Sequence, residues 1–414
     1  MLPNIIEHFS ILKDPRRDHP NKLHKLIDIV VIVIWGTLAN LESWEEIADY
    51  AEFKQDVLKQ YLELPNGIPT ADTLIRTFAL LDPMLFATTF RIWMENATPE
   101  SREVIRHLQL DGKWLLASKS TGTGKSQALQ AALQVVTVWA SEERLVLAQQ
   151  AVTQGSNEIV VAPEILENLN LENAVVTMDS AHAQLETLKV IQAGKGAYIV
   201  GVKGNQKRLY QALKDLFEDK QSQANMFKTF DVAHGRQEQR TLWALSDLEQ
   251  LNLADCRIEQ WQKVGLKSVF MVEKIVKRGG KESQEKRYYI GSVEPAAEQA
   301  LSLIRGHWSI EREQPARCCL VSKKNQQHYL LDVTFHEDLN RTRVGFAAEN
   351  LGLVRRMVLN VLSVQQTQQV KAGRKKISMR RMRTRSGWDD VYLLEVLGLK
   401  ALGWSGESSQ SASS

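Results

Sequence analysis

Residues 108–117 read LQLDGKWLLA, an apolar stretch that contains one acid, Asp111. Two further stretches rich in Val, Leu and Trp follow it at 129–140 and 144–152. Runs of this length and composition predict three successive β-strands, which could form a three-stranded meander. An acid inside the first strand is the feature from which the rest of the interpretation starts.

Helices and strands are predicted to alternate directly after these three strands. Helical patterns at 159–169, 185–193 and 206–217 are separated by short apolar segments at 174–178 and 197–202. The succession βββαβαβα predicts a mixed sheet with helices on its faces, which is the succession of an RNase H-like domain. The order of the strands in the sheet is not visible from the sequence.

The flanking regions have different patterns. Residues 1–97 are helical in period, with a turn at 64–69 (LPNGIP) and Thr70 as a predicted N-cap. Short alternating segments at 240–244, 268–277 and 287–290 predict a β-rich insertion. We therefore predict an α/β fold in five parts: a helical domain (1–97), the first part of the core (98–220), the insertion (221–295), the helical end of the core (296–362) and a basic region with a flexible tail (363–414).

Composition restricts the class of protein. The chain has 414 residues, of which 43% are hydrophobic and 24% charged, as in ordinary globular proteins. Its three cysteines form no CxxC pair, which argues against a structural zinc site and a secreted disulfide framework. The most apolar stretch, 29–35, is too short to cross a bilayer and predicts a buried helix. With no secretory signal visible, we expect a cytoplasmic protein that does not bind membranes.

Two acids lie where strands are predicted to end. Asp111 interrupts the first strand, and Asp179 closes the run Val175-Val176-Thr177-Met178. The carboxyl ends of strands are where α/β folds open their clefts, and carboxylates are the ligands that Mg²⁺ prefers. Each aspartate taken alone is more often a helix cap or a turn residue. A third acid, Glu311, follows a helical segment, and by composition it is a solvated helix residue.

Two further segments suggest phosphate binding. Eight Lys or Arg residues and no acid lie between Lys371 and Arg385, which suits DNA phosphates as well as a solvated tail. Residues 120–126 (STGTGKS) resemble a P-loop, but Lys119 stands where the first glycine is required and a strand follows. We therefore expect no ATP binding, and interpret this segment as a hairpin loop.

Several separate motifs together resemble one family. They are KDPRR (13–17), ESWEEIA (42–48), LPNGIP (64–69), DGK (111–113), SNEI (156–159), TMD (177–179), VKGNQ (202–206), HGR (234–236), HWSIE (307–311) and DVTFHED (332–338). Over nearly its whole length the chain resembles the transposases of the H-repeat (Rhs-associated) insertion sequences, a branch of the DDE transposases. Any one of these motifs alone would be weak.

The resemblance implies an RNase H-like core in which Asp111, Asp179 and Glu311 bind two Mg²⁺ or Mn²⁺ ions. It implies metal-dependent cleavage of double-stranded DNA at insertion-sequence ends, strand transfer to target DNA, a homodimer, and association with the bacterial nucleoid. The DNA contacts that we expect are Lys113, Lys203, Asn205, Gln206, His307, Trp308, Lys371, Arg374, Lys375, Lys376, Arg380, Arg381, Arg383 and Arg385.

The sequence departs from the family pattern beside Glu311. In the family, the catalytic Glu is followed directly by the pattern that begins here at Asn325, so the 13 residues 312–324 are interpreted as an insertion. This stretch contains Cys318 and Cys319. If it loops out, Glu311 still reaches the metal ions. If it disrupts the helix, the chain is a catalytically inactive DNA-binding remnant, and a metal-dependent DNA nuclease is a further alternative.

Overall fold

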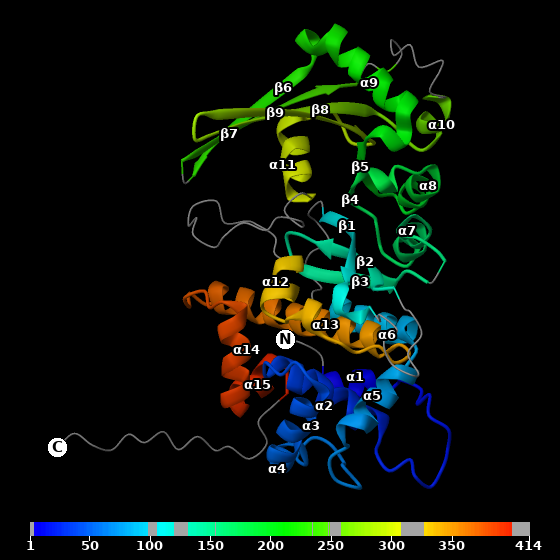
Figure 1. Ribbon diagram of the computed structural model, residues 1–414, viewed down its shortest axis with the longest axis vertical. Helices are drawn as coiled ribbons and strands as arrows, with labels where there is room; N and C mark the ends of the chain where they lie inside the picture. Colours follow the sequence, from blue (N-terminus) through cyan, green and yellow to red (C-terminus); the bar gives the residue numbers. More distant parts are fainter. Residues whose placement is uncertain are drawn as a thin grey trace, which may run out of the picture. The chain divides into compact units, whose positions relative to one another are not determined.

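The computed structural model describes residues 4–97, 106–119, 131–153, 155–233, 235–246, 248, 258–307 and 327–399. The chain divides into two compact units (Figure 1). The helical unit combines residues 1–99 with residues 340–414, and the sheet unit comprises residues 100–339. Each unit is described separately.

The first part of the helical unit has six helices, as the period of residues 1–97 predicts. They are α1 (Ile5–Phe9), α2 (Leu26–Leu38), α3 (Trp44–Phe53), α4 (Gln55–Leu58), α5 (Ala71–Leu80) and α6 (Pro83–Ala97). The apolar stretch 29–35 lies inside α2 and is fully buried, which confirms the prediction of a buried helix. Thr70 caps α5, since its side chain accepts a hydrogen bond from Thr73 N.

The last three helices pack against these first ones. They are α13 (Ala347–Lys371), α14 (Met379–Trp388) and α15 (Asp390–Val396). The side-chain amide of Asn350 donates hydrogen bonds of 2.8 Å to the carbonyls of Phe78 and Leu81 at the end of α5. Because these three groups are buried, the hydrogen bonds fix α13 against α5. Among the described residues, no helix is both long enough and apolar enough to span a membrane.

The sheet unit follows the predicted succession closely. Its strands are β1 (Arg106–Leu115), β2 (Leu133–Ala140), β3 (Leu145–Ala151), β4 (Ala174–Met178), β5 (Ala197–Val202), β6 (Asn225–Ala233), β7 (Arg236–Leu245), β8 (Ser268–Arg278) and β9 (Lys281–Gly291). Its helices are α7 (Glu158–Glu167), α8 (Leu185–Ala193), α9 (Lys207–Lys220), α10 (Ile258–Lys263), α11 (Ala297–His307) and α12 (Gln327–Val333).

These strands form one continuous mixed sheet. Its order is β3-β2-β1-β4-β5-β9-β8-β7-β6. The first three strands are a meander of antiparallel neighbours, as predicted, and β1, β4 and β5 run parallel. The β-rich insertion is not a separate sheet, because β9 pairs with β5 and extends the same sheet. The mixed α/β class is confirmed.

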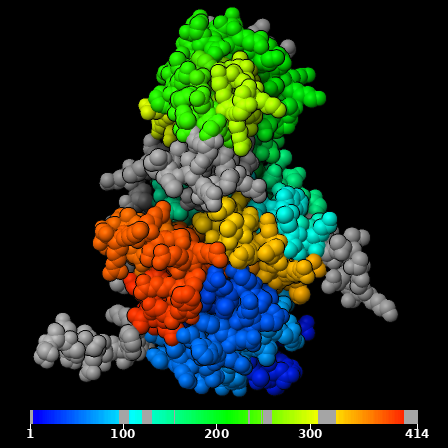
Figure 2. Space-filling view, turned by 60° about the vertical axis from the view of Figure 1, so that its left-hand side comes forward, coloured from blue at the N-terminus to red at the C-terminus, as the bar shows by residue number. Residues whose placement is uncertain are grey.

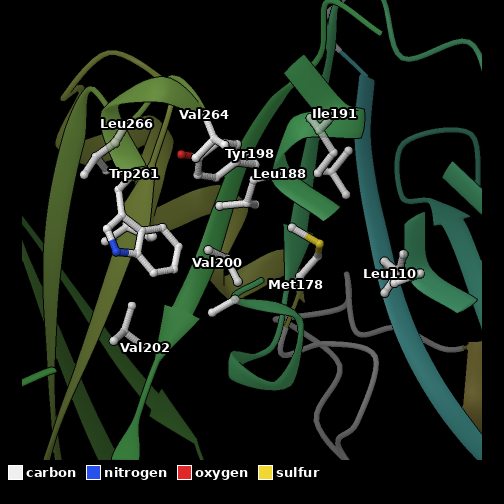
Figure 3. Close-up of a cluster of buried hydrophobic side chains, with 14 of the residues drawn as sticks. Leu110, Met178, Leu188, Ile191, Tyr198, Val200, Val202, Trp261, Val264 and Leu266 are labelled. Atoms are coloured by element: carbon white, nitrogen blue, oxygen red, sulfur yellow. The ribbon is translucent and has the colours of Figure 1, made fainter. Parts of the chain in front are cut away.

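Helices cover both faces of this sheet. Side chains of α7, α8 and α9 pack on one face, together with Tyr198, Val200 and Val202 of β5 and Trp261 of α10 (Figure 3). We call this the α7 face. The other face, here the α11 face, packs against Ala297, Ala300, Leu301 and Ile304 of α11. Successive side chains of a strand point to opposite faces, so position along each strand decides which face a residue joins.

Candidate active site

Asp111 and Asp179 lie at adjacent strand positions. β1 and β4 are parallel, and the last pair in their register is Leu110 with Met178. Asp111 directly follows Leu110, and Asp179 directly follows Met178. Neighbouring strands lie about 4.8 Å apart. Both carboxylates are partly accessible, with side-chain exposures of 15% and 30%. The fold therefore brings together two acids that are 68 positions apart in the sequence.

Backbone groups hold both carboxylates. Asp111 Oδ1 accepts a hydrogen bond of 2.9 Å from Gly112 N. Asp179 Oδ1 accepts one of 2.9 Å from Ala181 N and caps the short turn Ser180–His182. Hydrogen bonds from backbone N–H groups fix the orientation of a carboxylate.

A third acid, Glu158, lies beside them. It is the first residue of α7, which Asn157 caps. Its carboxylate occupies the space next to Gly112 where any larger residue would place its Cβ, so a larger residue there would displace the Glu158 side chain. Burial raises the pKa of Glu158, and the charge of Asp179 raises it further. The motif SNEI contains Glu158, but the sequence alone does not connect it with Gly112.

His328 of α12 lies close to Asp111. It belongs to the family pattern that begins at Asn325, after Glu311 and the stretch 312–324. Its Nδ1 lies 3.8 Å from Asp111 Oδ2. One helical turn later, Asp332 forms an ion pair with Lys113, which is two residues beyond Asp111 on the same side of β1. These two contacts place α12 across the end of β1. The sequence places His328 in the family pattern that begins at Asn325, but His328 was not among the predicted site residues.

Lys113 lies in a buried cluster of acids. Its ammonium also pairs with Glu337 at 2.9 Å and with Asp338 at 3.8 Å. Lys113 is only 7% exposed, and the Glu337 side chain is fully buried. A phosphate contact by Lys113, as the sequence suggests, would require this cluster to open.

A chain of buried polar side chains runs across the α11 face near the aspartates. The hydroxyl of Thr177 lies 2.8 Å from His107 Nε2 and 3.4 Å from His307 Nδ1, and His107 Nδ1 lies 3.0 Å from the hydroxyl of Ser141. Burial lowers the pKa of His107 and of His307 to about 4. Both rings are therefore neutral near pH 7. A phosphate contact by His307 would need this ring to leave its buried position.

Asn205 and Gln206 support the turn that follows Asp179. The Asn205 amide donates to the carbonyl of Ser180, and the Gln206 amide donates to that of Ala183 at 2.8 Å. Both residues also line a groove of about 840 Å³ together with residues of α7 and α8. Lys203 is exposed at the end of β5.

The predicted basic run is divided by the fold of the helical unit. Arg383 is fully buried, donates to the carbonyl of Thr37 and pairs with Glu42. Burial lowers its pKa to about 10. Arg385 lies over the Tyr392 ring at 4.2 Å. Arg385 and the other six members of the run are exposed; these six are Lys371, Arg374, Lys375, Lys376, Arg380 and Arg381.

Some predicted site residues lie outside the described part of the chain. They are Glu311, Trp308, the stretch 312–324 and the segment 120–126. Within the ranges that the structure describes, no group of three or more His, Cys, Asp or Glu side chains is arranged to hold a metal ion. The described site thus has two adjacent aspartates, with Glu158 and His328 beside them.

Comparisons with known proteins identify the family. The "DDE_Tnp_1-associated" model matches residues 6–94, and the "Transposase DDE domain" model matches residues 99–313. The putative protein YbfL and the H repeat-associated putative transposase YhhI, both of Escherichia coli (strain K12), are each 32% identical to this chain over 96% of it and 98% of their own length. The H repeat-associated putative transposase YbfD of the same organism is 32% identical over 58% of this chain and 92% of its own.

One solved structure, a piggyBac transposase synaptic complex with hairpin DNA, aligns with 98% of this chain and 83% of its own at 11% identity and a TM-score of 0.40, too weak a similarity to establish a common fold. The family models and relatives are sufficient by themselves. The chain therefore belongs to the family of the transposase DDE domain, and the predicted resemblance to the H repeat-associated DDE transposases is confirmed.

Proposed function

We propose that this chain cleaves DNA at the ends of an insertion sequence and joins the cut ends to target DNA, with Asp111, Asp179 and Glu311 as its metal-binding acids. The observation that carries the proposal is the register of β1 and β4, which puts two partly exposed aspartates at adjacent strand positions. The transposase DDE domain model covers both of them. The relatives named as putative transposases support the same activity.

We further propose that the core is RNase H-like. The meander of β1, β2 and β3, followed by β4 and β5 parallel to β1, supports this proposal. The succession of three strands and then two strands separated by helices is the one that the sequence predicts. β6 to β9 would then be an insertion that lengthens the sheet of the core.

The side chains present fit a divalent cation. Two carboxylates at adjacent positions offer hard oxygen ligands. Burial raises the pKa of Glu158, and the charge of Asp179 raises it further. Metal ions, which DDE transposases generally use, supply activation of the attacking oxygen and stabilisation of the leaving oxygen. Asp111 and Asp179, held by backbone hydrogen bonds, would be ligands, and the third would come from Glu311.

The DNA contacts are proposed at residues that the structure leaves accessible. Lys203 and Asn205 are exposed near the turn after Asp179, and the exposed cations of 371–381 form a second surface in the helical unit. Such contacts fix the position of the backbone without reading its sequence. We also propose a homodimer and a location at the bacterial nucleoid, which size-exclusion chromatography with light scattering and fluorescence microscopy test respectively.

The function is tested by incubating the protein with supercoiled DNA that carries candidate ends and Mg²⁺ or Mn²⁺. Nicking that Asp111→Asn and Asp179→Asn abolish, and that the exposed control Asp215→Asn retains, supports the proposal. Joining of the cut ends to a second DNA marks transposition, whereas hydrolysis without joining would indicate a nuclease. Nicking that survives both site substitutions would refute the assignment.

A second candidate is a catalytically inactive DNA-binding remnant. The observation that favours it is the stretch 312–324, which separates Glu311 from the rest of its family motif. If this stretch silences the site, its deletion restores cleavage. A deletion variant that binds DNA and remains inactive would count against that explanation.

A further inference from the structure

The strands β6 to β9 form a ribbon with two unlike faces (Figure 1). On the α11 face the strand register places six basic side chains and three acids. The basic residues are Arg236, Arg240, Lys274, Arg278, Lys281 and Arg287. The acids are Asp231, Glu238 and Glu285. This face therefore carries an excess of three positive charges.

The opposite face of the same ribbon is nearly balanced. It carries Lys228, Lys277 and Lys286 together with Glu273 and Glu282. Lys277 pairs with Glu282 at 3.0 Å, and Lys286 lies 3.9 Å from Glu273. The excess of positive charge thus belongs mainly to one face.

The row at the tip of the ribbon carries a cation on three of its four strands, and Ala233 of β6 is its fourth member. Arg236 pairs in register with Arg278, and Arg278 with Lys281. Like charges directly opposite each other destabilise a sheet, so strand pairing does not account for the cations at Arg278 and Lys281. Arg236 has a partner in Glu238, but no acid in the described residues pairs with Arg278 or Lys281, and both are exposed. An anion from outside would remove the repulsion.

This basic face lies on the same side of the sheet as Asp111. Leu108 and Leu110 of β1 belong to the core of the α7 face, and Asp111 alternates with them. His107, which has the same alternation as Asp111, packs against Gly306 of α11. Asp111 and the basic residues of the ribbon therefore share the α11 face of one continuous sheet.

The ribbon also extends past the edge at which the two aspartates lie. β5 is parallel to β4 and ends at Val202, which pairs with Tyr288. β9 continues seven residues further, to Lys281. At the rise of an extended strand this is roughly 24 Å beyond the carboxyl ends of β4 and β5. In the space-filling view, the residues of the ribbon are coloured green to yellow-green, together with those of α9 (Figure 2).

We propose that the α11 face of the ribbon, with Arg278 and Lys281 at its tip, binds the phosphate backbone of duplex DNA. The bound phosphates would lie next to the phosphodiester bond that is cleaved at Asp111 and Asp179. The proposal rests on the DNA substrate of the proposed function and adds a binding surface to it. Duplex DNA offers a dense row of phosphates, and cations that neutralise them release counterions. Contacts of this kind position the duplex and carry no sequence information.

The test compares two double substitutions with the same change of charge. Arg278→Ala with Lys281→Ala removes two cations from the α11 face, and Lys228→Ala with Lys277→Ala removes two from the opposite face. The full-length protein is titrated with a fluorescent 40-bp duplex of arbitrary sequence, in EDTA, from about 50 to 200 mM NaCl. Fluorescence anisotropy gives the affinity at each salt concentration, and thermal melting confirms folding.

The expected result is a loss of affinity on one face only. The α11-face pair should reduce the slope of log K against log salt by about 2 and weaken binding roughly 10-fold or more at the lowest salt. The opposite-face pair should change affinity less than about 2-fold, and Arg278→Lys with Lys281→Arg should retain binding. Equal losses from both pairs, or no loss from the first, would overturn the proposal.

Failure of this inference is distinct from failure of the proposed function. Binding is measured without divalent metal, so it does not depend on cleavage. A protein that binds DNA through Arg278 and Lys281 but never cleaves it would refute the catalytic proposal alone. A protein whose cleavage depends on Asp111 while the Arg278 and Lys281 pair has no effect on binding would refute this inference alone.

Discussion

Two acidic regions lie within a few residues of each other on β1 and differ in how their charge is balanced. Around Lys113, three carboxylates of the C-terminal part of the sheet unit surround one buried ammonium of the chain itself. Around Asp111, the carboxylate of Asp179 comes from the neighbouring strand and that of Glu158 lies at Gly112, with its pKa raised by burial and by the charge of Asp179. The first region carries its own cation and stabilises the fold. The second is the proposed cation site, because it offers carboxylate oxygens from neighbouring strands.

The largest expected effect comes from the second region. Asp111→Asn should lower DNA cleavage by roughly 100-fold or more, because it removes a proposed metal ligand. Its free energy of unfolding should change by less than about 0.5 kcal/mol, since the substitution removes a repelled charge and keeps the shape. Cleavage assays and urea unfolding of the same preparation measure both quantities. If Asp111→Asn lost much of its stability and retained cleavage, Asp111 would be a structural residue and not a metal ligand.

The first region should respond in the opposite way. Lys113→Met should lower the free energy of unfolding by about 3 to 5 kcal/mol, because it leaves the buried Glu337 carboxylate without its cation. The exposed Lys189→Met is the matched control and should cost at most about 1 kcal/mol. Urea unfolding followed by circular dichroism makes the comparison. Equal effects from both substitutions would mean that the acids around Lys113 do not need its charge.

The stability of the protein should depend on pH because of the buried histidines near Asp111 and Asp179. The pKa of His107 is about 4 in the folded protein, below its ordinary value near 6.5. As the pH falls, the ring therefore takes up a proton in the unfolded chain before it does so in the folded one. Stability from the neutral ring is complete above pH 6.5 and is lost as the pH falls toward 4, by roughly 3 kcal/mol. Unfolding measured from pH 7 to 4 tests this. His107→Gln should flatten the dependence, and an unchanged slope in that variant would assign it to other groups.

The smallest expected effect concerns Glu158. Its raised pKa means that the charged form is disfavoured in the folded protein, so stability falls as the pH rises above 4.5. Glu158→Gln should therefore stabilise the metal-free protein at pH 7, by no more than about 1 kcal/mol because the side chain is only half-buried. Thermal melting at pH 7 and pH 4 gives the difference. A destabilised variant at pH 7 would show that burial of the charge and repulsion from Asp179 do not decide the stability at this position.

The sequence predicts the elements of the sheet unit well and its side-chain roles less well. Alternation of apolar and polar residues marks β1 to β5 and the helices between them within a few residues of their bounds. It does not distinguish a cation at the surface from one in a buried ion pair. Lys113 and Arg383 have the composition of phosphate contacts in the sequence, and in the structure both are buried beside acids that lie far away in the chain.

Glu158 and His328 lie at the site, but the sequence did not predict them as site residues. Nothing local in SNEI indicates that the Glu158 carboxylate fills the space beside Gly112, because that contact depends on how α7 packs against β1. His328 reaches Asp111 only because the Lys113 cluster fixes α12 across the same strand. Contacts between elements distant in the chain carry no signature in a single sequence.

The sequence by itself determined the family, the succession of strands and helices, and the positions of Asp111 inside the first strand and Asp179 after the fourth, because periodicity and short motifs are local properties of the chain. Only the tertiary structure decided that the inserted strands continue the core sheet, that residues 340–399 join the N-terminal helices, and which charges are buried. Strand register and burial follow from packing between distant segments, and the energy of a charge depends on those surroundings rather than on its neighbours in sequence.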